Sequence, residues 1–154
     1  MLRVGYLALA VLCVANAIGA IALPSLAYAG HLLITEDEAR LPPPKGTIVA
    51  NWRGITRGPK IEVIGNGELS HSALHLQLKF ESFGGSKIDP DSVRVTYLKT
   101  PNVDLTERIK SFVRASGIDM PDAQLPPGDH MIRVDVRDSE GRMGSTTFVL
   151  KISP

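Results

Sequence analysis

The stretch LPPGDHMIRVDVRDSEGR, residues 125–142, gathers side chains that could do chemistry. It contains one histidine and four carboxylates, which are His130, Asp129, Asp135, Asp138 and Glu140. Imidazole and carboxylate groups can bind a divalent metal ion or share general acid–base work. The same stretch alternates apolar and polar residues, which predicts a strand whose side chains spread over two faces. We therefore expect these groups to shape one corner of a fold rather than to converge on a site.

Two alternating runs in this region predict an antiparallel hairpin. Ile132, Val134 and Val136 share one face of HMIRVDVRD, and STTFVLKI alternates again after the turn DSEGR. A few polar residues and a glycine between two such runs are typical of a hairpin. Asp135 is expected on the solvent face between cations, and His130 falls on the buried side of the strand.

Metal binding has two further candidate sets. His71 and His75 would lie about 13 Å apart on a strand at 3.3 Å per residue, which is too far for one ion. Oxygen ligands for calcium could come from two loops, through Asp89, Asp91, Asp138 and Glu140. Calcium takes six to eight oxygens and no EF-hand spacing is present, so turn roles are favoured and no metal or other cofactor is expected.

Nucleophilic catalysis has little support in the sequence. There is no G-x-S-x-G motif, and the single cysteine, Cys13, lies in an apolar N-terminal run. We expect a protein that is not an enzyme and has no catalytic residues.

The segment NWRGITRGPK combines one aromatic residue with several cations. These residues are Trp52, Arg53, Arg57 and Lys60. Tryptophan and arginine are the residue types that anchor protein interfaces, so the segment is a candidate docking strip for a protein or an acidic envelope polymer. The alternative is that Trp52 packs on the domain and the arginines are solvated. Trp52 with Phe83 could also form a sugar platform.

Several further segments predict the elements that would position these residues. KIEVIG (60–65), ALHLQLKFES (73–82) and VRVTYL (93–98) read as strands separated by turn residues. DLTERIKSFVRASG (104–117) has a capping-box spacing and helical periodicity, with an edge strand plus loop as the competing interpretation. The expected core is Leu74, Leu76, Leu78, Phe80, Val93, Val95, Tyr97, Ile132, Val134, Val136, Phe148 and Leu150.

The N-terminus has the pattern of a secretory signal. Arg3 precedes an apolar run over residues 4–23, and Ala27-Tyr28-Ala29 provides the small residues of a cleavage site. Cleavage after Ala29 is predicted, which makes 1–29 a signal peptide and the protein periplasmic or secreted. The alternative is an uncleaved inner-membrane anchor, because the 20 residues of 4–23 are long enough to span a bilayer.

Composition limits the partners. Removing 29 of 154 residues leaves 125 without cysteine, with 16 basic side chains (17 less Arg3) against 16 acidic ones. A neutral, mixed surface argues against nucleic acid and against generic binding to anionic membranes. The proline-rich piece LPPPKG makes residues 30–58 a flexible tether and docking segment in our prediction, followed by one domain over 59–154.

Residues 59–153 resemble a known family. The positions Ser92, Val93 and Val95, then Leu125, Pro126, Gly128 and His130, then Val134, Val136, Asp138 and Gly141 resemble bacterial immunoglobulin-like domains of the fibronectin-III and cadherin-like kind. The resemblance implies an all-β, immunoglobulin-like antiparallel β-sandwich with one short helix or helical turn. Such folds serve adhesion, scaffold and accessory roles.

The expected function is therefore a non-catalytic binding or structural module in the cell envelope, acting on a protein partner. Exposed sheet edges offer strand addition as one mode of recognition. The alternative is a carbohydrate- or calcium-binding accessory module.

Overall fold

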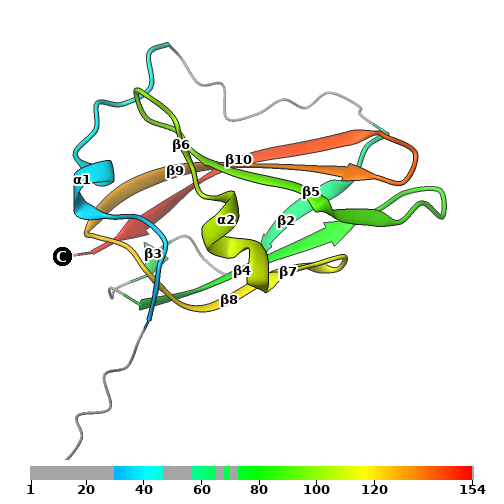
Figure 1. The fold of residues 1–154 in the computed structure, drawn as a ribbon, viewed down its shortest axis with the longest axis horizontal. Helices are drawn as coiled ribbons and strands as arrows, with labels where there is room; N and C mark the ends of the chain where they lie inside the picture. Colours follow the sequence, from blue (N-terminus) through cyan, green and yellow to red (C-terminus); the bar gives the residue numbers. More distant parts are fainter. Residues whose placement is uncertain (1–29, 47–56, 65–67, 70–72, 154) are drawn as a thin grey trace, which may run out of the picture.

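The computed structural model describes residues 30–46, 57–64, 68–69 and 73–153. Over these residues the chain is mostly β, with two sheets and a few short helical turns (Figure 1). The expectation of an all-β fold is therefore met at this level. Both sheets contribute apolar side chains to one buried cluster.

The first sheet is built around two long central strands. Its order is β1 (His31–Leu32), β8 (Gly117–Gln124), β4 (Ala73–Glu81) and β2 (Lys60–Ile64), and β7 (Val113–Arg114) pairs with the other end of β8. The alternating stretches that predicted β2 and β4 form these strands. Leu74, Leu76 and Leu78 share the inner face of β4, as the period of two required.

The second sheet contains the predicted hairpin. Its order is β3 (Glu68–Leu69), β10 (Met143–Ile152), β9 (Gly128–Asp138), β5 (Ile88–Tyr97) and β6 (Val103–Asp104). β9 and β10 pair antiparallel without interruption from Arg137 opposite Met143 to Gly128 opposite Ile152. Gly141 has φ +78°, which is the positive value that the turn was expected to need.

The core matches the sequence expectation closely. Of the predicted residues, only Phe148 lies partly exposed at the border of the cluster, while the others are buried. The structure adds further buried residues that are not in this expected core, namely Leu33, Ile34, Ile88, Leu105, Ile109, Ile118, Met120, Ala123, Leu125 and Ile152.

β8 was not predicted as a strand, because proline and aspartate interrupt its sequence, GIDMPDAQ. The pairing of β4 with β8 shifts register between Leu74 and Leu76, and Asp122 adopts φ 54° at this irregularity. A bulge of this kind accommodates Pro121, which cannot donate to a ladder of hydrogen bonds. Ile118, Met120 and Ala123 nevertheless point into the core.

The first part of the expected tether is packed onto the domain, which corrects the prediction of a mobile arm there. We call residues 31–43 the N-terminal strap. β1 pairs in parallel with β8, and Leu33 and Ile34 are fully buried. The following helix α1 (Glu36–Ala39) begins with a capping box, in which Thr35 and Glu38 bond each other's backbone N–H.

Further bonds hold the strap along its length. Glu38 accepts two hydrogen bonds from the guanidinium of Arg108, at 2.7 and 2.8 Å. The Lys99 ammonium donates to the carbonyl of Ala39, and Thr100 N–H donates to that of Pro42. Buried leucine and isoleucine side chains outweigh the local bias of the prolines toward an extended arm.

The segment 104–116 contains both of the predicted alternatives. After β6 come a short helix α2 (Thr106–Ile109), a 3₁₀ turn η1 (Lys110–Phe112) and β7. The capping box expected at Asp104 does not form as predicted. Its carboxylate accepts from the Thr106 N–H at 2.9 Å, and the N-cap residue is Leu105, which makes no side-chain cap bond.

Candidate functional site

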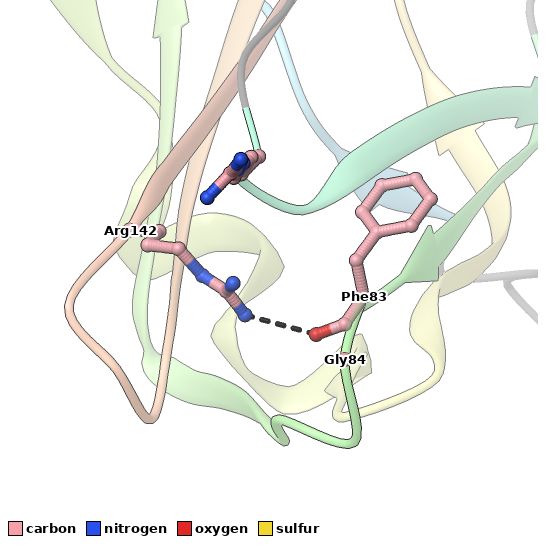
Figure 2. Close-up of a pocket in the computed structure, with 4 residues that line it drawn as sticks. Phe83, Gly84 and Arg142 are labelled. Atoms are coloured by element: carbon pink, nitrogen blue, oxygen red, sulfur yellow. Dashed lines mark hydrogen bonds between the residues drawn. The ribbon is translucent and has the colours of Figure 1, made fainter.

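One open cavity, of about 350 Å³, lies where the β9–β10 hairpin meets the loop between β4 and β5. It is lined by Arg57, Phe83, Gly84 and Arg142, and we call it the hairpin-end cavity. Figure 2 shows Arg142 reaching from the hairpin toward the backbone carbonyl of Phe83. The lining thus combines an aromatic ring with two guanidinium groups and contains no acid.

The loop between β4 and β5 presents Phe83 outward. Gly84 and Gly85 have φ +68° and +78°, a backbone conformation that other residues rarely adopt. Among the described residues, no atom other than those of its two chain neighbours lies within 4 Å of where a Cβ on Gly84 would stand. Phe83 is 48% exposed, which is similar to the other exposed large apolar residues, Leu32, Ile64 and Met143.

Arg142 ties this loop to the hairpin. Its Nε donates to Asp138 Oδ2 at 2.8 Å, and its Nη2 donates to the Phe83 carbonyl at 2.9 Å and to the Ser86 hydroxyl at 2.8 Å. Its Nη1 lies 3.2 Å from Glu140. These bonds fix the guanidinium plane and leave little of the side chain free to move.

Asp138 is the buried anchor of this network. Its side chain is fully buried, and its second oxygen accepts from the backbone N–H groups of Glu140 and Arg142 at 3.0 and 2.9 Å. Burial acts to raise the pKa of Asp138, but the hydrogen bonds from Arg142, Ser86 and the backbone outweigh burial and hold the pKa below its usual range. The carboxylate is therefore charged and saturated with donors.

The calcium candidates are not brought together as ligands. Asp138 is occupied by Arg142, Glu140 pairs with the same guanidinium, and Asp89 accepts from the Asp91 N–H at 3.1 Å in a local turn. In the part of the chain that the structure describes, no three histidine, cysteine or acidic residues form a cluster that could hold a metal ion.

The docking strip is only partly within the described residues. Trp52 and Arg53 lie outside them. Arg57 is exposed and lines the hairpin-end cavity, and no hydrogen bond or ion pair joins it to the described part of the chain. Lys60 lies on β2 at 3.8 and 3.7 Å from Glu62 and Glu81, so its charge is already matched on the sheet.

Close backbone contact places Arg57 beside the hairpin. A Cβ on Gly58 would collide with the carbonyl oxygen of Met143, and one on Gly144 would collide with that of Pro59. Both glycines allow the chain entering β2 to lie directly on β10. The sequence showed these glycines but gave no sign of which segments they join.

In the stretch 125–142, Asp138, Glu140 and Arg142 meet at the end of the hairpin, while His130 and Asp135 lie along β9. His130 is buried, its Nε2 donates to the Pro126 carbonyl at 2.7 Å, and its Nδ1 lies 3.0 Å from the Tyr97 hydroxyl. Asp135 pairs with Arg133 at 2.9 Å. On the other sheet, exposed His75 contacts Asp119 at 2.5 Å, while His71 lies outside the described residues.

A second cleft, of about 290 Å³, lies between β5 and α2. Its charged lining residues are Asp91, Arg94, Glu107 and Lys110, so acids and bases are balanced. Glu107 and Lys110 are already paired at 3.5 Å. This cleft offers no uniform charge to a ligand.

Sequence reasoning did not place Gly84 or Arg142 in a site. The available signals were the glycine turn that follows Phe83 and the spacing of Asp138 and Arg142 across a tight turn. These signals indicate that a side chain could connect two loops, but they do not identify the loops.

No helix within the described residues is long and apolar enough to cross a membrane, and residues 4–23 lie outside them. Comparison with known proteins finds no matching family model, curated protein or solved structure. Functional inference therefore rests on the residues of this chain.

Proposed function

We propose that this chain is an exported, non-catalytic binding module that mediates a protein–protein interaction in the cell envelope. The observation that carries the proposal is the hairpin-end cavity, where Phe83 is half exposed beside Arg57 and Arg142. Aromatic residues and arginine are enriched where proteins bind one another. The Arg142 network holds the loop in place before a partner arrives, which lowers the entropic cost of binding.

The proposed fold is immunoglobulin-like. Strands β2, β4 and β8 lie together in one sheet, and β10, β9 and β5 lie together in the other. If these strands are taken as A, B and E in one sheet and G, F and C in the other, with β6 as C′, their order resembles that of an immunoglobulin sandwich, which supports the proposal. Loops at the ends of such sandwiches commonly carry the binding function.

Export is supported by the N-terminal sequence. The basic head, apolar run and A-x-A ending of residues 1–29 match a secretory signal, and no cysteine follows Cys13. We propose a periplasmic or secreted location, with an inner-membrane anchor through residues 4–23 as the alternative. The intact mass of the exported chain distinguishes them: cleavage leaves Gly30 as the first residue, whereas the anchor keeps residues 1–29.

The absence of catalysis is also part of the proposal. The four lining residues include no hydroxyl, thiol, imidazole or carboxylate side chain that could act as nucleophile or general base. Guanidinium groups and an exposed ring can bind and orient a ligand.

Partner recovery from the native host tests the proposal. We expect the affinity-tagged protein to recover a discrete partner, and Phe83→Ala to abolish that recovery while melting as the parent does. Leu32→Ala is the matched control, because Leu32 is 52% exposed at a distant edge of the molecule. Equal recovery by Phe83→Ala and the parent would show that the cavity is not the binding surface.

A carbohydrate-binding module is the second candidate, because the exposed ring of Phe83 could stack on a sugar. A thermal-shift screen with sugars and divalent cations separates the two candidates, since a ligand that binds only the folded state raises the melting temperature. A sugar that raises it in the parent but not in Phe83→Ala would favour this second function.

A further inference from the structure

We infer that the hairpin-end cavity recognises a carboxylate next to an apolar side chain on the partner protein. This inference deepens the proposed function and rests on it. Three features carry it: the charge of the lining, the division of roles between the two arginines, and the shape of the space beside Phe83.

The lining has cations without acids. Arg57 and Arg142 face the cavity, and the remaining lining residues, Phe83 and Gly84, are uncharged. The cleft between β5 and α2 is different, since acids and bases there are equal in number. Because Arg142 is already paired with Asp138 and Glu140, the attraction for an anion at this cavity comes from Arg57.

The two arginines have different roles. Arg142 is neutralised by Asp138 and Glu140, and most of its donors are used within the fold. Arg57 makes no ion pair or hydrogen bond with the described part of the chain, so its fork of donors is available. A carboxylate fits such a fork through two parallel hydrogen bonds. Arg57 is thus the binding cation, and Arg142 is a positioning residue for the loop.

Phe83 sets the second requirement. Phe83 is 48% exposed, and among the described residues only its chain neighbours lie within 4 Å of a Cβ position on Gly84. An aliphatic or aromatic side chain beside the carboxylate would cover the ring and exclude water from the ion pair. Removing water strengthens the electrostatic contact, so the two contacts support each other.

A matched pair of small probes tests this inference. N-acetylphenylalanine carries a carboxylate and a ring, and N-acetylphenylalanine amide carries the same ring without the charge. Each is titrated into ¹⁵N-labelled exported protein while the amide signals of Phe83, Gly84 and Arg142 are followed by NMR. We expect the acid to shift these signals and to bind at least about tenfold more tightly than the amide, as a charge-assisted bond would give.

Two variants assign the preference to one side chain. Arg57→Gln is expected to remove the difference between acid and amide. Lys60→Gln is the matched control, because it removes a nearby exposed cation that is already paired with Glu62 and Glu81. Raising the salt concentration is expected to weaken the binding of the acid probe and to leave the binding of the amide probe unchanged.

Several results would overturn the inference. Equal binding of the two probes, or no shift at these amides with either, would show that the cavity does not select a carboxylate. Shifts with glucuronic acid and none with N-acetylphenylalanine would point to an acidic saccharide instead. If a partner is recovered through Phe83 but Arg57→Gln does not weaken it, the proposed function stands and this inference fails. If the acid probe is preferred but no partner is recovered, the cavity selects a carboxylate, and the claim that this carboxylate belongs to a protein partner fails.

Discussion

His130 is a buried polar side chain with both ring nitrogens satisfied. A carbonyl oxygen can only accept, so the bond to Pro126 requires a proton on Nε2, and Nδ1 then accepts from the Tyr97 hydroxyl. Burial, as the largest effect, lowers the pKa of His130 below 6.5. The folded protein therefore holds this histidine neutral at the pH where the unfolded chain begins to protonate it.

This arrangement predicts a loss of stability on acidification. Because the unfolded state binds the proton more readily, the free energy of unfolding falls as pH decreases below about 6.5 and stops falling below the lowered pKa of the folded state. Denaturant unfolding between about pH 7.5 and 5.5 measures the slope. In His130→Gln, whose amide can both donate and accept, the slope is expected to be smaller. An identical slope in the parent and in His130→Gln would contradict the assignment of this pH dependence to His130, because the other histidines are the same in both proteins.

Asp138 and Glu140 contact the same guanidinium but differ in burial. The Asp138 side chain has no exposed surface, whereas that of Glu140 is 56% exposed. Asp138→Asn is expected to lower the melting temperature severalfold more than Glu140→Gln, because it leaves Arg142 and two backbone N–H groups with weaker acceptors. Thermal unfolding of the two variants makes the comparison, and similar losses would show that the buried bonds do not anchor the loop.

At the scale of elements, the N-terminal strap is the main departure from expectation. Leu33 is fully buried, while its neighbour Leu32 is 52% exposed. Leu33→Ala is expected to cost about 2–5 kcal/mol of stability through loss of burial and an unfilled cavity. Leu32→Ala is expected to stay within about 0.5 kcal/mol of the parent. Denaturant unfolding distinguishes the two variants. Equally small losses of stability would contradict the packing of the strap and support the prediction of a mobile tether.

Glu38 fastens the strap to α2 in a pH-dependent way. The hydrogen bonds from Arg108, as the largest effect, lower the pKa of Glu38 from 4.5 to about 2. Its contribution to stability is therefore complete above about pH 4.5 and is lost as pH falls toward about 2. Hydrogen exchange of the Leu33 and Ile34 amides, expressed relative to the intrinsic exchange rate at each pH, should rise over this window. Glu38→Gln should show the raised exchange already at neutral pH, whereas Glu36→Gln, at an exposed pair, should not.

At the scale of the whole molecule, the sequence predicted most of the core but only part of the site. Period-two alternation identified β4, β9 and β10, because half-buried strands must alternate. It missed β8, where Pro121 and Asp122 are accommodated by a bulge, and it missed the strap, although Thr35 and Glu38 have the spacing of a capping box. Local patterns of this kind do not show which distant segment of the chain packs against the residues concerned.

The hairpin-end cavity was hidden for the same reason. Arg57 was singled out by residue type, but Phe83 and Arg142 come from loops far apart in the chain. The pairing of Ile88 with Asp138, the bond from Arg142 to Phe83 and the contact of Gly58 with Met143 bring the three together. Contacts over such sequence separation depend on the complete fold.

The strap also changes the geometry expected at a membrane. If residues 4–23 were retained as an anchor, only residues 24–29 would separate them from Gly30, next to β1. Six residues span at most about 20 Å when fully extended. The anchored form would hold the domain close to the bilayer, whereas a 29-residue tether would not.

Site-specific photo-crosslinking in the native host tests the central claim most directly. A photo-reactive residue replaces Phe83 in the exported protein, and a second variant carries it at Gln77, on the exposed face of β4. We predict one discrete protein crosslinked from position 83 and none from position 77. The same protein captured from both positions, or none captured from position 83, would contradict the claim that the hairpin-end cavity is a protein-binding surface.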